Sequence, residues 1–250
     1  MNKKYIGQLL LSFLLIYLSP LSIAQTIKMG FGESLRPYVI QENNSGIEVD
    51  IIRAALAYKN HHLIPIYAPL HSLPILFDKQ RVDAINVKLQ VNLTRTHFDA
   101  QPSLFYQDVI VTLEKNNYTI KQSSDLKGLR VFAFHNAHLY YPEWLVPLKN
   151  TAMYKEGSLQ FSQVSLLHLQ RVDAIIADEN IIQYYTHRLK KEGKVTLLPT
   201  RIHSFAKPLP IKASFAQQSI RDDFNKGLVH LQETGEYQKI IDRYKKARLY

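Results

Sequence analysis

The sequence predicts an α/β protein built as two similar lobes, and a repeated hexapeptide is the main reason. Gln-Arg-Val-Asp-Ala-Ile occurs at Gln80–Ile85 and again at Gln170–Ile175. Each copy follows apolar residues at helical spacing and continues into an apolar, strand-like segment. This helix–turn–strand unit recurs once, and the spacing between the two copies is too wide for a solenoid repeat. It therefore indicates two α/β units of similar structure. Small ligands commonly bind in clefts between such units; chance agreement of a common turn is the alternative.

The first unit reads as alternating strands and helices. Residues 26–31 alternate and predict a strand, and a turn-rich loop follows up to residue 45. Residues 46–59 place apolar side chains on one helical face, so we expect a helix there. The remaining elements are a strand at 63–67, a helix at 72–79 and a strand at 82–87. This βαβαβ order is typical of a parallel sheet covered by helices.

The second unit has the same character and is reached by a continuous apolar strand at 108–113. We expect strands at 129–134, 172–177 and 195–199, helices at 158–169 and 180–191, and a helical region at 139–148 that Pro142 and Pro147 interrupt. An extended stretch at 202–215 returns to the first unit, and helices at 217–234 and 236–248 close the chain. The two crossings predict a two-strand hinge, with lobe I at 25–110 and 205–250 and lobe II at 111–204.

The first 24 residues have the features of an export signal. Lys3 and Lys4 precede an apolar core at 9–18, and Ser22-Ile23-Ala24 offers small residues at a cleavage position. That core is shorter than the ~20 apolar residues that span a membrane. We therefore expect a cleaved signal peptide at 1–24 and an exported, soluble mature chain. An uncleaved membrane anchor is the alternative.

Composition excludes several classes of protein and of site. The 250 residues include no cysteine, which excludes a disulfide framework and a lipid-modified N-terminal Cys. The net charge is +10, but basic residues are scattered, with short runs only at Arg188–Lys191 and Lys245–Arg248. A solvated surface explains them better than nucleic acid does. The pair His135 and His138 has no convincing third ligand nearby. We expect no nucleic acid partner, no metal, no cofactor, and a monomer.

Five motifs in order carry a family resemblance. They are Gly46–Ile52, Arg81–Ile85, Asp125–Val131, Arg171–Asp178 and Gly235–Tyr244. Together they resemble the bacterial periplasmic solute-binding proteins of the polar amino acid type (solute-binding family 3), over nearly all of residues 26–250. The resemblance implies a two-lobed type II periplasmic binding protein fold, with a mixed, mainly parallel sheet in each lobe. It also implies a periplasmic protein, not an enzyme, that captures a small polar ligand, an amino acid or derivative, for an inner-membrane ABC permease.

The same resemblance assigns two charged residues to the ligand. Arg95 follows Asp83 at the distance where the family keeps the arginine that holds the ligand's α-carboxylate, and a planar guanidinium suits that task. Asp178 follows Asp173 where the family keeps the acid that takes the α-ammonium group. A surface cation is the alternative for Arg95. A helix N-cap is the alternative for Asp178.

Aromatic walls are implied by two further matches. Tyr38 lies in a segment similar to the family's x-P-[FY] loop, and Tyr106 lies in one similar to the motif before the hinge. Rigid aromatic side chains suit pocket walls, although both residues would also fit a core.

Two segments depart from the family pattern. Val87-Lys88-Leu89-Gln90 replaces small residues, and Asn136-Ala137-His138 replaces the G-[ST]-[ST] whose N–H groups and hydroxyls grip a carboxylate. We expect Lys88, Gln90, Ala137 and His138 to contact the ligand. The positive charge of Lys88 and His138 indicates a more acidic ligand or a different one.

Two other functions remain open on the same scaffold. One is an enzyme similar to the periplasmic cyclohexadienyl dehydratases, which would need a further acid in the cleft; Glu33 and Glu179 are available. The other is a sensory module that reports ligand occupancy to a separate membrane protein.

Overall fold

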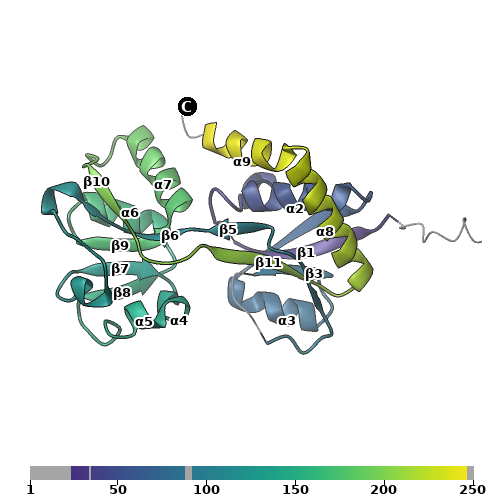
Figure 1. Cartoon of the computed structure of the whole chain (residues 1–250), viewed down its shortest axis with the longest axis horizontal. Helices are drawn as coiled ribbons and strands as arrows, with labels where there is room; N and C mark the ends of the chain where they lie inside the picture. Colours follow the sequence, from purple (N-terminus) through teal and green to yellow (C-terminus); the bar gives the residue numbers. More distant parts are fainter. Residues whose placement is uncertain (1–23, 34, 88–91, 247–250) are drawn as a thin grey trace, which may run out of the picture.

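The computed structural model describes residues 24–33, 35–87 and 92–246, and these form two lobes side by side along the long axis of the molecule (Figure 1). The signal segment at 1–23 and the predicted ligand contacts Lys88 and Gln90 lie outside the described residues. Each lobe consists of a mixed sheet with helices packed against it, which confirms the predicted two-lobed α/β fold.

Lobe I is built on a sheet of order β2-β1-β3-β11-β4, with β5 paired to β11. Strands β1, β2 and β3 are parallel to one another, and β11 is antiparallel to its neighbours. The strands are β1 (Thr26–Gly32), β2 (His62–Ala68), β3 (Ala84–Val87), β4 (Phe98–Asp99), β5 (Leu104–Tyr106) and β11 (Leu209–Phe215).

Lobe II is built on a sheet of order β10-β6-β9-β7-β8. Here β7, β8 and β9 are parallel, and β6 and β10 are antiparallel to their partners. The strands are β6 (Asp108–Leu113), β7 (Val131–Phe134), β8 (Tyr154–Gly157), β9 (Ala174–Asp178) and β10 (Thr200–Ser204). Parallel strands bring their carboxyl ends to one edge of a sheet, which is where α/β proteins bind ligands.

Within the residues that the structure describes, each lobe has four α-helices. Lobe I carries α2 (Ile47–Ala57), α3 (Leu73–Asp78), α8 (Gln218–Glu233) and α9 (Glu236–Lys246). Lobe II carries α4 (Ala137–Tyr140), α5 (Pro142–Leu145), α6 (Gln160–His168) and α7 (Glu179–Glu192). In lobe I, α2 and α8 lie on one side of the sheet and α3 on the other (Figure 1). The contact of α2 with α8 is close at Gly227, where an added Cβ would lie 1.9 Å from the Ala55 carbonyl oxygen.

The two hexapeptides form the same turn. Gln80 and Gln170 both adopt a left-handed conformation, with φ of 56° and 59°. In each copy the N–H of this glutamine and of the following arginine bonds to carbonyls of the preceding helix end, at Phe77 and Leu76 or at Leu167 and Leu166. This is the Schellman arrangement that ends a helix and turns the chain. The repeat therefore encodes a helix stop followed by a strand.

The aspartate of each copy ties its strand to a neighbouring one. The Asp83 carboxylate accepts a hydrogen bond from the Lys28 N–H, 2.9 Å away. The Asp173 carboxylate accepts one from the Arg130 N–H at 2.8 Å, and the Arg130 guanidinium binds the same carboxylate through two nitrogens. In each lobe, the aspartate therefore fixes the turn to the neighbouring strand, β1 or β7. The strand that follows the turn, β3 or β9, pairs with that same neighbour.

Two extended segments of the described chain connect the lobes. One passes from β5 through Gln107 into β6, and the other passes from β10 into β11, which pairs antiparallel with β5. The Gln107 side chain donates to the Ala206 carbonyl at 3.0 Å and so joins the two segments. Since β6 lies wholly in the lobe II sheet, the division proposed from the sequence at residue 110 falls inside that strand.

The strand expected at 195–199 is wrong: this segment has no regular structure, and the strand is β10, which starts at Thr200. Val195, Leu197 and Leu198 are apolar because they pack on the core, while β10 pairs with β6 and buries only His203. Strands β4, β5 and β8 were not expected from the sequence.

Candidate functional site

A hydrogen bond between the lobes defines the candidate site. Tyr38 lies in the loop after β1 of lobe I, and Asp178 ends β9 of lobe II. The Tyr38 hydroxyl donates to the Asp178 carboxylate at 2.9 Å, and the Asn180 side-chain amide donates to the Tyr38 oxygen at 3.0 Å. Two residues expected to contact the ligand therefore meet at the carboxyl edge of the lobe II strands.

Asp178 also caps α7, as the alternative interpretation of the sequence expected. Its carboxylate accepts hydrogen bonds from the N–H groups of Ile181, at 3.1 Å, and Gln107, at 2.9 Å. Only 2% of its surface is exposed. Burial and the nearby charge of Asp108 raise the pKa of Asp178 to about 6, despite the opposing hydrogen bond from Tyr38. Capping of α7 does not prevent Asp178 from binding a ligand ammonium group, because a carboxylate accepts several hydrogen bonds at once.

Asp108 is the second carboxylate at this place. It faces Asp178 across the β6–β9 ladder and is 1% exposed. The hydroxyl of Tyr141, between α4 and α5, donates to it at 2.6 Å. Two buried carboxylates side by side repel each other, so this corner of lobe II is strongly favourable for a positive charge.

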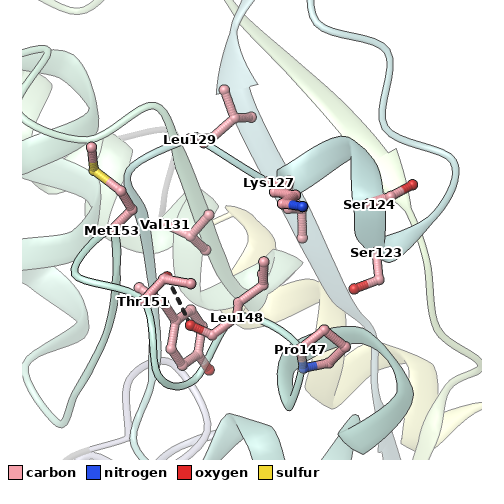
Figure 2. A pocket seen from close by; sticks show the side chains of 12 residues that line it. Ser123, Ser124, Lys127, Leu129, Val131, Pro147, Leu148, Thr151 and Met153 are labelled. Carbon is pink, nitrogen blue, oxygen red and sulfur yellow. Dashed lines mark hydrogen bonds between the residues drawn. The ribbon is translucent and has the colours of Figure 1, made fainter.

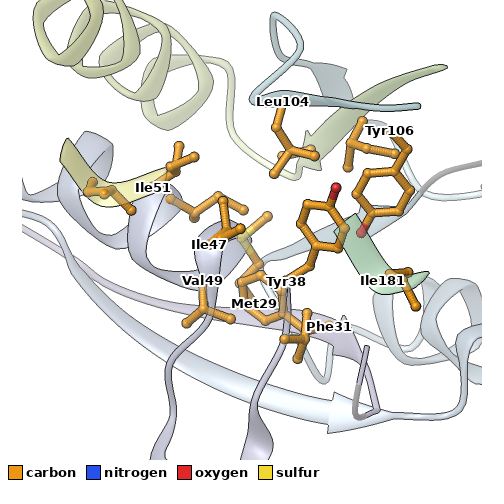
Figure 3. Close-up of a cluster of buried hydrophobic side chains, with 14 of the residues drawn as sticks. Met29, Phe31, Tyr38, Ile47, Val49, Ile51, Leu104, Tyr106 and Ile181 are labelled. Atoms are coloured by element: carbon orange, nitrogen blue, oxygen red, sulfur yellow. The ribbon is translucent and has the colours of Figure 1, made fainter. Parts of the chain in front are cut away.

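A chain of polar contacts continues from Tyr38 into lobe I. The rings of Tyr38 and Tyr106 lie 4.3 Å apart (Figure 3). The Tyr106 hydroxyl donates to the buried Glu48 carboxylate at 2.8 Å, and the Asn86 amide bonds to the other oxygen of that carboxylate. Burial raises the pKa of Glu48 to about 7, against the effect of both hydrogen bonds. Glu48 is a residue that the sequence reasoning missed, although it lies inside the helix-start motif that was recognised.

Arg95 points into its own lobe. Its Nη1 group donates to the carbonyls of Phe77 and Val82, at 3.1 and 3.0 Å, on either side of the first hexapeptide turn. The guanidinium also stacks over the Phe77 ring. Nη1 is thus committed to closing the turn between α3 and β3, and the carboxylate anchor at Arg95 stays a prediction.

The N–H groups at the start of α4 hold a carboxylate from the protein itself. Glu156 of β8 accepts from the N–H groups of Asn136 and His138, both at 2.9 Å, and from the His138 ring at 2.8 Å. The Tyr154 hydroxyl adds a fourth bond at 2.6 Å. Ala137, which was predicted to contact the ligand, lies between Asn136 and His138 in the sequence and is fully buried. Glu156 was missed because β8 itself was not expected.

No cluster of three His, Asp or Glu side chains that would suit a metal ion occurs within the described ranges. Nor is any helix that the structure describes long and apolar enough to cross a bilayer.

A cavity of about 400 Å³ lies elsewhere on lobe II (Figure 2). It is bordered by the segment from Ser123 to Val131 and by residues between Pro147 and Tyr154. Because Val131 begins β7, this cavity lies at the amino edge of the parallel strands, away from Asp178 at their carboxyl edge. It is not part of the candidate site.

Comparison with known proteins gives one family match. The model of bacterial extracellular solute-binding proteins, family 3, matches residues 27–247. No curated protein sequence matches the chain.

Several solved structures share the fold at low sequence identity. The GluR0 ligand-binding core in complex with L-glutamate is 16% identical, with a TM-score of 0.69, over 88% of this chain and 98% of that one. The amino acid ABC transporter substrate-binding protein AbpA from Streptococcus pneumoniae, bound to L-arginine, is 14% identical, with a TM-score of 0.67 over 90% and 96%. A histidine kinase sensor domain similar to periplasmic binding proteins is 16% identical, with a TM-score of 0.65 over 88% and 95%.

Proposed function

Because the chain belongs to family 3 of the bacterial extracellular solute-binding proteins, we propose that it captures a small polar ligand between its lobes in the periplasm. The signal peptide directs it there and is cleaved. The ligand is an amino acid or a derivative of one, and the monomeric, loaded protein delivers it to an inner-membrane ABC permease. This transport role is the function that the family and the site support best.

The observation that carries the proposal is the bond between Tyr38 and Asp178. It places a buried carboxylate of lobe II against an aromatic side chain of lobe I, next to the two segments that connect the lobes. A ligand ammonium group that binds Asp178 there would compete with the Tyr38 hydroxyl and contact both lobes together. Ligand binding would then change the relation of the lobes, as in hinged binding proteins.

In this proposal Arg95 binds the ligand carboxylate through the guanidinium nitrogens other than Nη1. A guanidinium has five N–H donors, and Nη1 supplies those bonded to Phe77 and Val82. Nε and Nη2 are the groups that a ligand would use. Lys88, Gln90, Ala137 and His138 remain predicted contacts around it.

We propose binding without turnover. Of the two acids available for a dehydratase-like reaction, Glu33 is exposed, and Glu179 accepts a hydrogen bond from Gln183 in the first turns of α7. These surroundings support binding rather than general acid catalysis by Glu33 or Glu179. Incubation of the mature protein with prephenate or arogenate should leave both unchanged, and formation of a decarboxylated aromatic product would refute this part of the proposal.

A thermal-shift screen of the mature protein tests the function directly. The compounds are amino acids, short peptides, small carboxylates and small amines. A ligand at about 100 times its Kd should add about 2.7 kcal/mol of stability. Small-angle scattering should show a changed radius of gyration with the same ligand.

The screen includes Arg95→Ala, measured against its own ligand-free baseline. The baseline matters because loss of the bonds to Phe77 and Val82 will lower stability without any ligand. Loss of the ligand-induced shift would support the anchor, and an unchanged shift would remove Arg95 from the site. Failure of every compound to stabilise the wild type or to change its radius of gyration would overturn the proposed function.

A further inference from the structure

Glu156 is ionised and fully engaged at neutral pH. Burial alone would raise its pKa, but the hydrogen bonds from Tyr154 and His138 hold the pKa of Glu156 below its usual value. The ammonium group of Lys149 lies 2.8 Å from Nε2 of His138 and donates to it. An ammonium nitrogen can only donate, so Nε2 accepts from Lys149, and Nδ1 is the ring nitrogen that faces Glu156. The Glu156 carboxylate therefore accepts four hydrogen bonds, from two backbone N–H groups, the His138 ring and the Tyr154 hydroxyl.

These donors lie at the same edge of lobe II as Asp178. Strands β7 and β9 are parallel neighbours, so the segment after β7, which holds Asn136 and His138, lies beside the end of β9. Tyr141, directly after α4, reaches Asp108, which faces Asp178. A molecule bound at Asp178 would have the Glu156 site as its neighbour.

The charges at this edge are asymmetric. The N–H groups that would suit a ligand carboxylate already hold the carboxylate of Glu156, and Arg95 has turned Nη1 to its own backbone. The acids Asp108 and Asp178 are buried beside tyrosine rings from both lobes. Carboxylates and aromatic faces are the groups that attract an organic cation.

We propose that the ligand of the candidate site is an organic amine cation without a free carboxylate, and that Glu156 is the residue that determines this specificity. The inference rests on the proposed function and narrows its ligand from amino acids and derivatives to decarboxylated ones. Such a ligand leaves Arg95 with no carboxylate to anchor. The ammonium group binds at Asp178 and Asp108. A carboxylate on the same molecule would be brought against the Glu156 carboxylate, and juxtaposed like charges weaken binding.

Three pairs of compounds test this, because the members of each pair differ by one carboxylate: agmatine and arginine, cadaverine and lysine, putrescine and ornithine. Titration calorimetry of the mature wild-type protein should show at least one amine binding tighter than its amino acid by about tenfold or more. Equal or tighter binding of the amino acid in every pair that binds would overturn the inference, as would absence of binding by all six compounds.

Variants assign the effect to Glu156. Glu156→Ala vacates the donors, and Glu156→Gln removes the charge while it keeps one acceptor in place. Both should reduce the preference for the amine by about tenfold. Glu143→Ala removes an exposed glutamate of the same lobe and should leave the preference unchanged. Melting curves establish first that each variant folds, and the inference is tested on whichever Glu156 variant does.

The experiments distinguish a failure of the amine inference from a failure of the proposed solute-binding function. A compound from the wider screen that binds while all six of these do not would overturn the amine inference and leave the solute-binding function standing. An unchanged preference in folded Glu156 variants would overturn the role of Glu156 alone.

Discussion

The hydroxyl of Tyr38 donates a hydrogen bond to the carboxylate of Asp178, 2.9 Å away, across the boundary between the lobes. Tyr38 comes from the loop after the first strand of lobe I, and Asp178 ends a central strand of lobe II. Because the bond is buried, it joins the lobes in a place where water does not compete for it. Ligand-free stability and lobe orientation should both depend on it.

Tyr38→Phe tests this contact with little change of shape. The ring contact with Tyr106 is retained, but the hydroxyl shared by Asp178 and Asn180 is lost. Urea unfolding should show a loss of about 1–3 kcal/mol, since the hydrogen bond involves a charged acceptor. Because the bond restrains the lobes, scattering should show a larger radius of gyration for the variant.

Tyr184→Phe is the control for that experiment. Tyr184 packs edge-on against Tyr185, and its hydroxyl has no hydrogen bond within the described residues. Its removal should change stability by about 0.5 kcal/mol or less. Equal losses in the two variants would contradict the role assigned to the Tyr38 hydroxyl.

Glu48 should make stability depend on pH. Burial raises its pKa from 4.5 to about 7, so between these values the folded state holds more protons than the unfolded state. The free energy of unfolding should therefore fall as the pH rises through this window. Glu48→Gln should flatten the fall and should stabilise the protein at pH 8 by about 1–3 kcal/mol.

The comparison for Glu48 is the difference between variant and wild type at each pH. Burial lowers the pKa of His168 and His203, and their protonation destabilises the fold at the acid end in both proteins alike. Glu114→Gln, which neutralises an exposed carboxylate, should leave the curve unchanged. A parallel pH curve for Glu48→Gln would show that Glu48 is ionised throughout.

Gln80→Gly should stabilise the protein. Gln80 holds a φ of 56°, a conformation that costs less for glycine, which is the usual residue at this position of a helix end. We expect a gain of about 0.5–1 kcal/mol in chemical unfolding, and a smaller gain for Gln170→Gly, because the Gln170 side chain accepts a hydrogen bond from Lys115 that this change removes. Lys79→Gly, one residue earlier with φ of −82°, should instead destabilise. A loss in both glutamine variants would contradict the strain argument.

Gly227→Ala should destabilise lobe I. The added Cβ would lie 1.9 Å from the Ala55 carbonyl oxygen, so α8 would have to move away from α2. We expect a loss of about 3 kcal/mol by thermal or urea unfolding. Val229→Ala, on the more exposed side of the same helix, should change stability by about 0.5 kcal/mol or less. A neutral Gly227→Ala would show that the two helices separate easily.

Much of the architecture was predictable because it depends on local patterns. The hexapeptide recurs since both lobes need the same helix stop and the same aspartate, and these requirements act over a few residues. Strand β6 was expected at its observed bounds from a continuous apolar run. The segment at 195–199 was misassigned because its apolar residues serve the core without joining a sheet.

The sequence by itself determined the two lobes and the segments that join them, because periodicity and turn chemistry are written in consecutive residues. The ligand-binding role of Asp178 stays a prediction from the family's motif spacing. Only the tertiary structure decided how the charges are paired. It turned Arg95 to the carbonyls of Phe77 and Val82 and seated Glu156 on the N–H groups at the start of α4. Hydrogen bonds between distant segments depend on where the folded backbone brings each donor and acceptor, and no local pattern encodes that.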